Sequence, residues 1–189
     1  MPVTLDLFIE HTLPALIRAR NTLCFILTTG FEPFEYDRDR HQAHSRFPIH
    51  VCAAEYTPKN TLDTQLGMGL LGTPYRVGLS NEALCQIHRE RSEALRSLFD
   101  LVAKDRHPTQ RHLLFVYIHG HEIRPACELM RTHQAEFPMD NIVMICEHTA
   151  YNENKVTLQL MIDDGTLAGL VVTDDADGRY VLSDLIEYL

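Results

Sequence analysis

The sequence predicts a three-layer α/β/α single domain covering residues 1–189. Two observations support this fold class. Short apolar runs typical of buried strands alternate with longer segments whose apolar residues recur at helical spacing. Strands connected through helices favour parallel pairing, whereas a short turn near the end favours an antiparallel hairpin. We therefore expect a mixed sheet with parallel core strands and a C-terminal antiparallel hairpin.

The first half of the chain is predicted to contain one helical segment and two strands. Residues 4–20 carry an apolar stripe at helical spacing. Pro14 either kinks this helix or starts a second one with Thr12 as its N-cap. Two runs rich in β-formers follow, TLCFILTT at 22–29 and FPIHVCAAEY at 47–56, and both are typical of strands.

The middle of the chain combines a long loop with alternating helices and strands. Residues 57–79 hold four glycines and two prolines without a clean period, which indicates a functional or mobile loop. A helix capped by Ser80 then continues to about residue 104. The predicted elements that follow are a strand at 112–118, a helix at 123–137 and a strand at 141–146.

The C-terminal part has the pattern of a hairpin. VTLQLMI (156–162) and LAGLVV (167–172) flank an Asp-Gly turn signal. A second turn could return RYVL (179–182) as a third antiparallel strand. SDLIEYL (183–189) is predicted to close the chain as a short helix capped by Ser183.

Composition narrows the class of protein. The net charge of -9, without a run of Lys and Arg, argues against non-specific nucleic-acid binding. The longest apolar runs are about seven residues, far below the roughly 20 needed to span a bilayer, so no membrane segment is expected. The first residues do not resemble a signal peptide. The five scattered cysteines are typical of reduced thiols in a cytoplasmic protein.

Polar side chains gather where two predicted strands end. If the strands at 112–118 and 141–146 are parallel, their carboxyl ends meet at one edge of the sheet, where ligand sites of open α/β sheets lie. The candidate catalytic residues at this edge are His119, His121, Glu122, Cys146, Glu147 and His148.

Three chemistries could use these residues. A divalent metal could take His119, His121 and His148 as ligands and keep a position open for water. A His/Glu pair could carry out general acid-base catalysis. Cys146 could act as a nucleophile with His119 as its base.

The third chemistry has a parallel in a known family. A strand ending in His-Gly (HLLFVYIHG), a crossover and a strand ending in Cys (NIVMIC) resembles the order of catalytic residues in caspase-like peptidases. The resemblance implies a Cys146/His119 peptidase site. The chain departs from the family pattern at Ile145, where that family commonly has a small residue.

A simpler interpretation is that these residues are ordinary surface groups. Strand-to-helix loops are exposed to solvent, and Glu122 would favour the positive end of the following helix.

Two further sequence motifs are weak indications of a binding site. GMGLLG (67–72) lacks the preceding strand and following helix of a dinucleotide fingerprint. DDADG (174–178) fits a turn better than a calcium loop.

Two functions remain open. The first is a small hydrolase-like enzyme that acts on a small-molecule or peptide substrate at this edge. The second is a non-catalytic adaptor or regulatory protein that binds a protein partner through its long loops, where Met68, Leu70 and Leu71 are apolar. The sequence does not define the oligomeric state.

Overall fold

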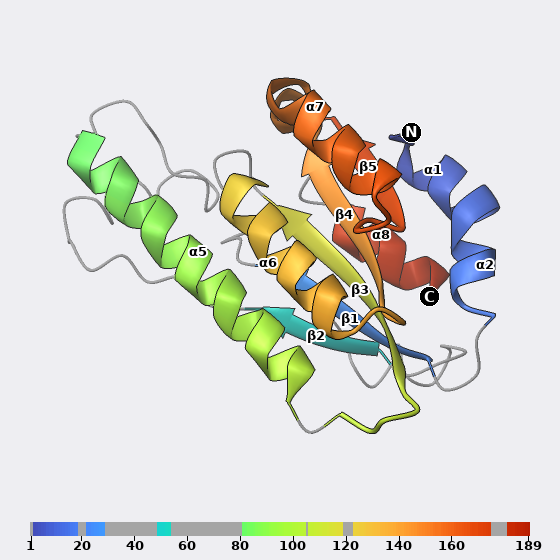
Figure 1. Cartoon of the computed structure of the whole chain (residues 1–189). Helices are drawn as coiled ribbons and strands as arrows, with labels where there is room; N and C mark the ends of the chain where they lie inside the picture. Colours follow the sequence, from blue (N-terminus) through green and yellow to red (C-terminus); the bar gives the residue numbers. More distant parts are fainter. Residues whose placement is uncertain are drawn as a thin grey trace.

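The computed structural model describes residues 2–18, 22–28, 49–53, 81–104, 106–118, 123–174 and 181–189. These residues form a parallel sheet with helices on both faces (Figure 1). The predicted α/β class is therefore confirmed. The loop at 57–79 and the expected cap Ser80 lie outside the described residues.

The described strands form one sheet in the order β2-β1-β3-β4-β5. All neighbouring pairs are parallel. The strands are β1 (Thr22–Thr28), β2 (Ile49–Ala53), β3 (Arg111–Ile118), β4 (Asn141–Glu147) and β5 (Gly169–Thr173). Each lies within or close to a segment predicted as a strand. β3 and β4 are buried on both faces, which explains their nearly continuous apolar sequences.

Three helices cover one face of the sheet (Figure 1). They are α5 (Asn81–Ala103), α6 (Ile123–Glu136) and α7 (His148–Asp163). Leu98 of α5, Met130 of α6 and Leu158 of α7 belong to one apolar cluster with Leu114 and Met144 of the sheet. The helices predicted near 80–104 and 123–137 are thus confirmed.

The N-terminal segment and the last helix pack on the opposite face. The N-terminal segment comprises α1 (Leu5–Leu7), a π-helical stretch η1 (Phe8–Thr12) and α2 (Leu13–Leu16), and the last helix is α8 (Val181–Tyr188). The ring of Phe8 meets Phe115 of β3 edge-on, with 6.0 Å between centroids. Pro14 lies in the first turn of α2, as expected if a second helix begins there, although Thr12 makes no side-chain cap hydrogen bond.

The predicted C-terminal hairpin is wrong. Residues 156–162 belong to α7, and β5 pairs in parallel with β4. The third antiparallel strand is also wrong, because Val181 and the residue after it begin α8. The closing helix is confirmed, and it starts two residues before the expected cap, Ser183. All strand pairs in the described part of the chain are therefore parallel, and the sheet found there is not mixed.

Two local features explain the error. Leu158 and Met161 are buried and three residues apart, which is helical spacing, although the β-formers around them suggested a strand. Gly165 has a φ of 80° and follows the end of α7, where its N–H donates to the carbonyl of Ile162 at 3.1 Å. A glycine at positive φ suits the end of a helix as well as a hairpin turn. The Asp-Gly pair in the sequence therefore could not distinguish a helix end from a hairpin.

The outer edge of β5 is partly covered by the start of the chain. Val3 pairs in parallel with Val171, and its N–H and carbonyl bond to Leu170 and Val172 at 3.0 Å each. Pairing of this kind protects a strand edge from joining another chain. None of the helices in the described part of the chain combines the length and apolar character needed to cross a membrane.

Candidate functional site

The carboxyl ends of the central strands lie level with one another. Thr28 of β1 is opposite Tyr117 of β3, and Ile118 of β3 is opposite Cys146 of β4. The parallel arrangement of β3 and β4, on which the expected site depends, is thus confirmed. The carboxyl ends of these strands therefore lie at the same edge of the sheet.

Of the six candidate residues, three belong to the described part of the chain. Cys146 and Glu147 end β4, and His148 is the exposed first residue of α7. His119, His121 and Glu122 lie outside the described residues. The structure therefore brings the β4 members of the expected set to the carboxyl edge, and the histidine pair after β3 stays a prediction.

Glu147 accepts a hydrogen bond from a tyrosine that the sequence pattern did not identify as a site residue. The hydroxyl of Tyr117 donates to Oε1 of Glu147 at 3.0 Å. Tyr117 is 2% exposed, and a buried hydroxyl is costly unless it has a partner. The bond links the ends of β3 and β4 on the face that α8 covers. Tyr117 looked like a core residue of an apolar strand, and its position two residues before His119 was the only available signal.

Glu147 also precedes α7 as its N-cap residue, with extended backbone angles of φ -74° and ψ 156°. Its side chain makes no cap hydrogen bond to the helix. The carboxylate instead bonds to Tyr117. The side chain thus lies against the sheet edge and does not close the helix end.

Cys146 has properties that disfavour a role as nucleophile. Its side chain is fully buried in the cluster beneath α5, α6 and α7. Burial raises the pKa of its thiol to about 12, and the nearby Glu147 carboxylate and Cys127 add to the effect. A cysteine nucleophile needs a thiolate that substrate can reach. The resemblance to caspase-like peptidases therefore gains no support from Cys146.

Metal binding is not indicated by the described residues alone. No group of three or more His, Cys, Asp or Glu side chains there could hold a metal ion. Glu147 and His148 could supply one carboxylate and one imidazole. Any complete metal site at this edge would need the residues that follow β3.

A second polar cluster lies at the amino edge of the sheet, and the sequence did not reveal it. Asp140, just before β4, accepts two hydrogen bonds from Arg106 at 2.6 and 2.7 Å. His133 Nε2 lies 2.7 Å from Oδ2 of Asp140. The backbone N–H of His112 donates to Oδ1 of Asp140 at 3.0 Å. This amino-edge cluster consists of Arg106, His112, His133 and Asp140.

The amino-edge cluster has the features of a cluster that stabilises the fold. Burial alone would raise the pKa of Asp140, but the hydrogen bonds from Arg106 and His133 outweigh it and lower the pKa to about 2. The ring of Phe137 packs against both Arg106, at 3.9 Å, and His133, at 4.9 Å between centroids. The cluster joins the end of α6 to the starts of β3 and β4, and it is closed to substrate.

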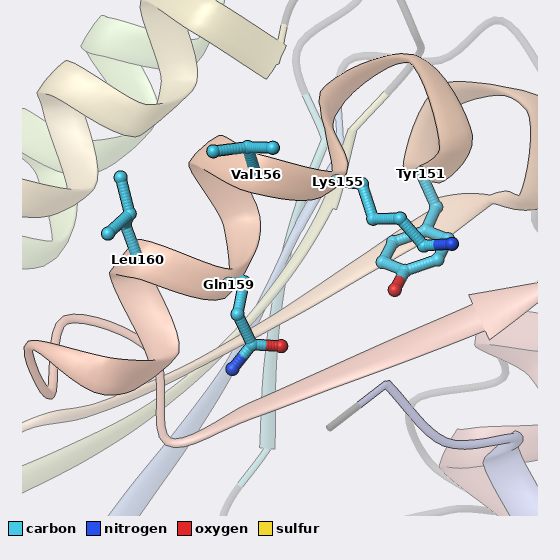
Figure 2. A pocket seen from close by; sticks show the side chains of 5 residues that line it. All are labelled: Tyr151, Lys155, Val156, Gln159 and Leu160. Carbon is cyan, nitrogen blue, oxygen red and sulfur yellow. The ribbon is translucent and has the colours of Figure 1, made fainter.

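The outer surface of α7 carries an apolar hollow of about 370 Å³. Its lining residues are Tyr151, Lys155, Val156, Gln159 and Leu160 (Figure 2). Val156 and Leu160 are one helical turn apart and are 76% and 55% exposed. The Lys155 ammonium lies 5.6 Å from the centroid of the Tyr151 ring. This hollow lacks the converging polar groups of a catalytic site.

The described residues form an α/β fold with a parallel sheet and helices on both faces. Comparisons with protein-family models, curated proteins and solved structures give no match. The interpretation of the candidate site is therefore argued from the geometry of the site alone.

Proposed function

We propose that the chain is an enzyme of the hydrolase type, with its site at the carboxyl edge of the sheet. Strand order supports this more than any other observation. β2 lies on one side of β1, whereas β3, β4 and β5 follow on the other side, so the order reverses between β1 and β3. Open α/β sheets bind ligands in the crevice outside the carboxyl ends of their strands at such a reversal.

The residues that follow β3 in sequence have suitable chemistry for this position. His119 and His121 would bind a divalent metal or transfer protons. Glu122 or Glu147 would act as base or ligand, and His148 would support them. The substrate would be a small molecule or a peptide. The proposal gives Cys146 no role, because its thiol is buried.

The test is hydrolysis of a panel of chromogenic esters, phosphate esters and peptides by the full chain. We expect His119→Ala and His121→Ala to lower kcat/KM by about 100-fold or more, the scale of lost acid-base or metal catalysis. His107→Ala is the matched control, because His107 is exposed in the segment before β3 and bonds to Thr109 at 2.8 Å.

Two results would contradict the proposal. One is the absence of turnover by the wild-type chain across the panel. The other is turnover that His119→Ala and His121→Ala leave unchanged.

The α7 hollow favours a second candidate function, the binding of a protein partner. Val156 and Leu160 expose aliphatic surface, and Lys155 supplies a positive charge beside them. Charge complementarity therefore fits an amphipathic helix with aliphatic side chains next to a carboxylate.

A designed peptide would test this second function. The probe is a fluorescent helical peptide with leucines and glutamates on one face, measured by anisotropy. We expect the double variant Val156→Ser/Leu160→Ser to lose binding and Leu101→Ser, on exposed α5 surface, to keep it. Equal binding by both variants, or none by wild type, would rule out this surface.

A further inference from the structure

α7 consists of two helical segments that meet at Asn154. The φ and ψ angles of Asn154, -122° and 16°, are not helical. Residues 148–153 form the first segment, and residues 155–163 form the second. The side-chain amide of Asn154 donates to the carbonyl of Ala150 at 2.9 Å, so a hydrogen bond ties the first segment to the break. A local break of this kind lets the two parts of a helix differ in direction.

The two segments are positioned by different contacts. Leu158 and Met161 of the second segment are fully buried in the core cluster beneath the helices. The first segment begins at the exposed His148, directly after β4 ends at the carboxyl edge of the sheet. A change in the angle at Asn154 therefore moves His148, while the core holds the second segment in place.

The α7 hollow spans the break. Its lining residues come from both segments, with Tyr151 before Asn154 and the other four after it (Figure 2). A molecule that contacts both Tyr151 and Leu160 therefore bridges the break. Such a molecule binds best at the one angle that brings both side chains against it, and this difference in affinity is what shifts a conformational equilibrium.

The charges on α7 favour a different protein over a second copy of the chain as the occupant. An antiparallel pairing of two α7 helices that sets Val156 against Leu160 also sets Glu153 against Asp163. A parallel pairing in register sets each of these acids against its own copy. Like charges that face each other across an interface are unfavourable. The occupant that fits is the amphipathic partner helix whose carboxylate pairs with Lys155.

From this geometry we infer that the α7 hollow is a regulatory site. A partner helix bound there fixes the angle at Asn154 and thereby the position of His148 at the carboxyl edge. The inference rests on the partner-binding function proposed for the hollow, and it deepens that function by assigning what the binding controls. Asn154 is the positioning residue, because its bond to Ala150 links the first segment to the second.

The experiment is two-dimensional NMR of the ¹⁵N-labelled full chain with the helical leucine and glutamate peptide at saturation. We expect the amides of Glu147 and His148 to shift, although neither residue lines the hollow. Asn154→Asp removes the donor to Ala150 and should reduce these two shifts about twofold or more, as expected for a residue on the coupling route. The shifts of Val156 and Leu160 should remain.

Asn152→Asp is the matched control, because it makes the same chemical change at an exposed position of the first segment. It should leave all the shifts as in wild type. Asn154→Leu removes the donor without adding a charge, and it provides the test if Asn154→Asp does not fold. Circular dichroism checks the fold of each variant.

The outcomes separate this inference from the function on which it rests. If the peptide binds and only the amides of residues 151–160 shift, the inference is overturned and partner binding stands. Shifts of Glu147 and His148 that Asn154→Asp leaves unchanged would indicate direct contact with the peptide, and they also overturn the inference. If wild type binds no peptide, partner binding and the inference both fail, and the hydrolysis panel still decides the enzymatic function.

Discussion

At the scale of single residues, the two edges of the sheet use polar groups differently. At the amino edge, Asp140 is fully buried and surrounded by donors from Arg106, His112 and His133. At the carboxyl edge, Glu147 is half-buried and bonded to Tyr117. The first arrangement compensates a charge inside the protein, and the second fixes a half-buried carboxylate where the central strands end.

The amino-edge cluster leads to a prediction about stability. Asp140→Asn removes the charge that compensates Arg106 and replaces one of the two accepting oxygens with an NH2 group that can only donate. Removing one partner of a buried ion pair costs about 3 kcal/mol or more, so the free energy of unfolding should fall by that amount in urea titrations. Asp100→Asn, at an exposed position of α5, should change it by less than about 0.5 kcal/mol. A similar loss in both variants would contradict the anchoring role.

The same carboxylate predicts a pH dependence. The pKa of Asp140 is about 2 in the folded chain, below its ordinary value of 3.8. Between about pH 2 and pH 4 the unfolded chain binds more protons than the folded chain does. The stabilisation that Asp140 contributes is therefore present above about pH 4 and is lost as the pH falls toward 2. We expect the free energy of unfolding to fall over this range by about 2 kcal/mol more in wild type than in Asp140→Asn. Equal slopes for the two proteins would contradict the prediction.

At the scale of elements, α7 shows both what the sequence could predict and what it could not. β3, β4, α5 and α6 were predictable, because each has a single clear period or a continuous buried run. α7 was not, because Val156, Thr157 and Ile162 favour strands locally, whereas packing of Leu158 and Met161 against the sheet selects the helix. The helix also tolerates a break at Asn154, whose amide bonds to the carbonyl of Ala150 at 2.9 Å.

The candidate site was predictable to a similar degree. The edge followed from the apolar strands and the helix between them, which fix a parallel pair. Tyr117 was missed because its partner, Glu147, is 30 residues away in the sequence. The amino-edge cluster was missed for the same reason, since Arg106 and Asp140 are 34 residues apart. Contacts between distant residues leave no periodic pattern in a single sequence.

The end of α7 leads to a third prediction. Gly165 has positive φ, and a Cβ added there would meet nothing within 4 Å. Gly165→Ala should therefore cost about 1 kcal/mol from the backbone alone, and Gly165→Asn should cost less because asparagine tolerates this conformation. Urea titrations of the two variants check the order. If asparagine destabilises as much as alanine, positive φ does not explain how this helix ends.

At the scale of the whole molecule, two apolar clusters hold helices on both faces of a parallel sheet and leave its two edges for polar groups. The buried cluster around Asp140 occupies the amino edge at the starts of β3 and β4. The strand order reverses between β1 and β3, which makes the carboxyl edge the expected position for a ligand. We therefore propose that stability and function are divided between the two edges.

The most direct test of this account is to locate where ligands bind. Two-dimensional NMR of the ¹⁵N-labelled chain, titrated with a library of small polar fragments, reports the position of binding through amide shifts. We predict that the shifts gather at the carboxyl ends of the central strands, around Thr28, Ile118, Glu147 and His148. Shifts that gather instead around Arg111 and Asn141, or on α7 around Val156 and Leu160, would contradict the proposed site.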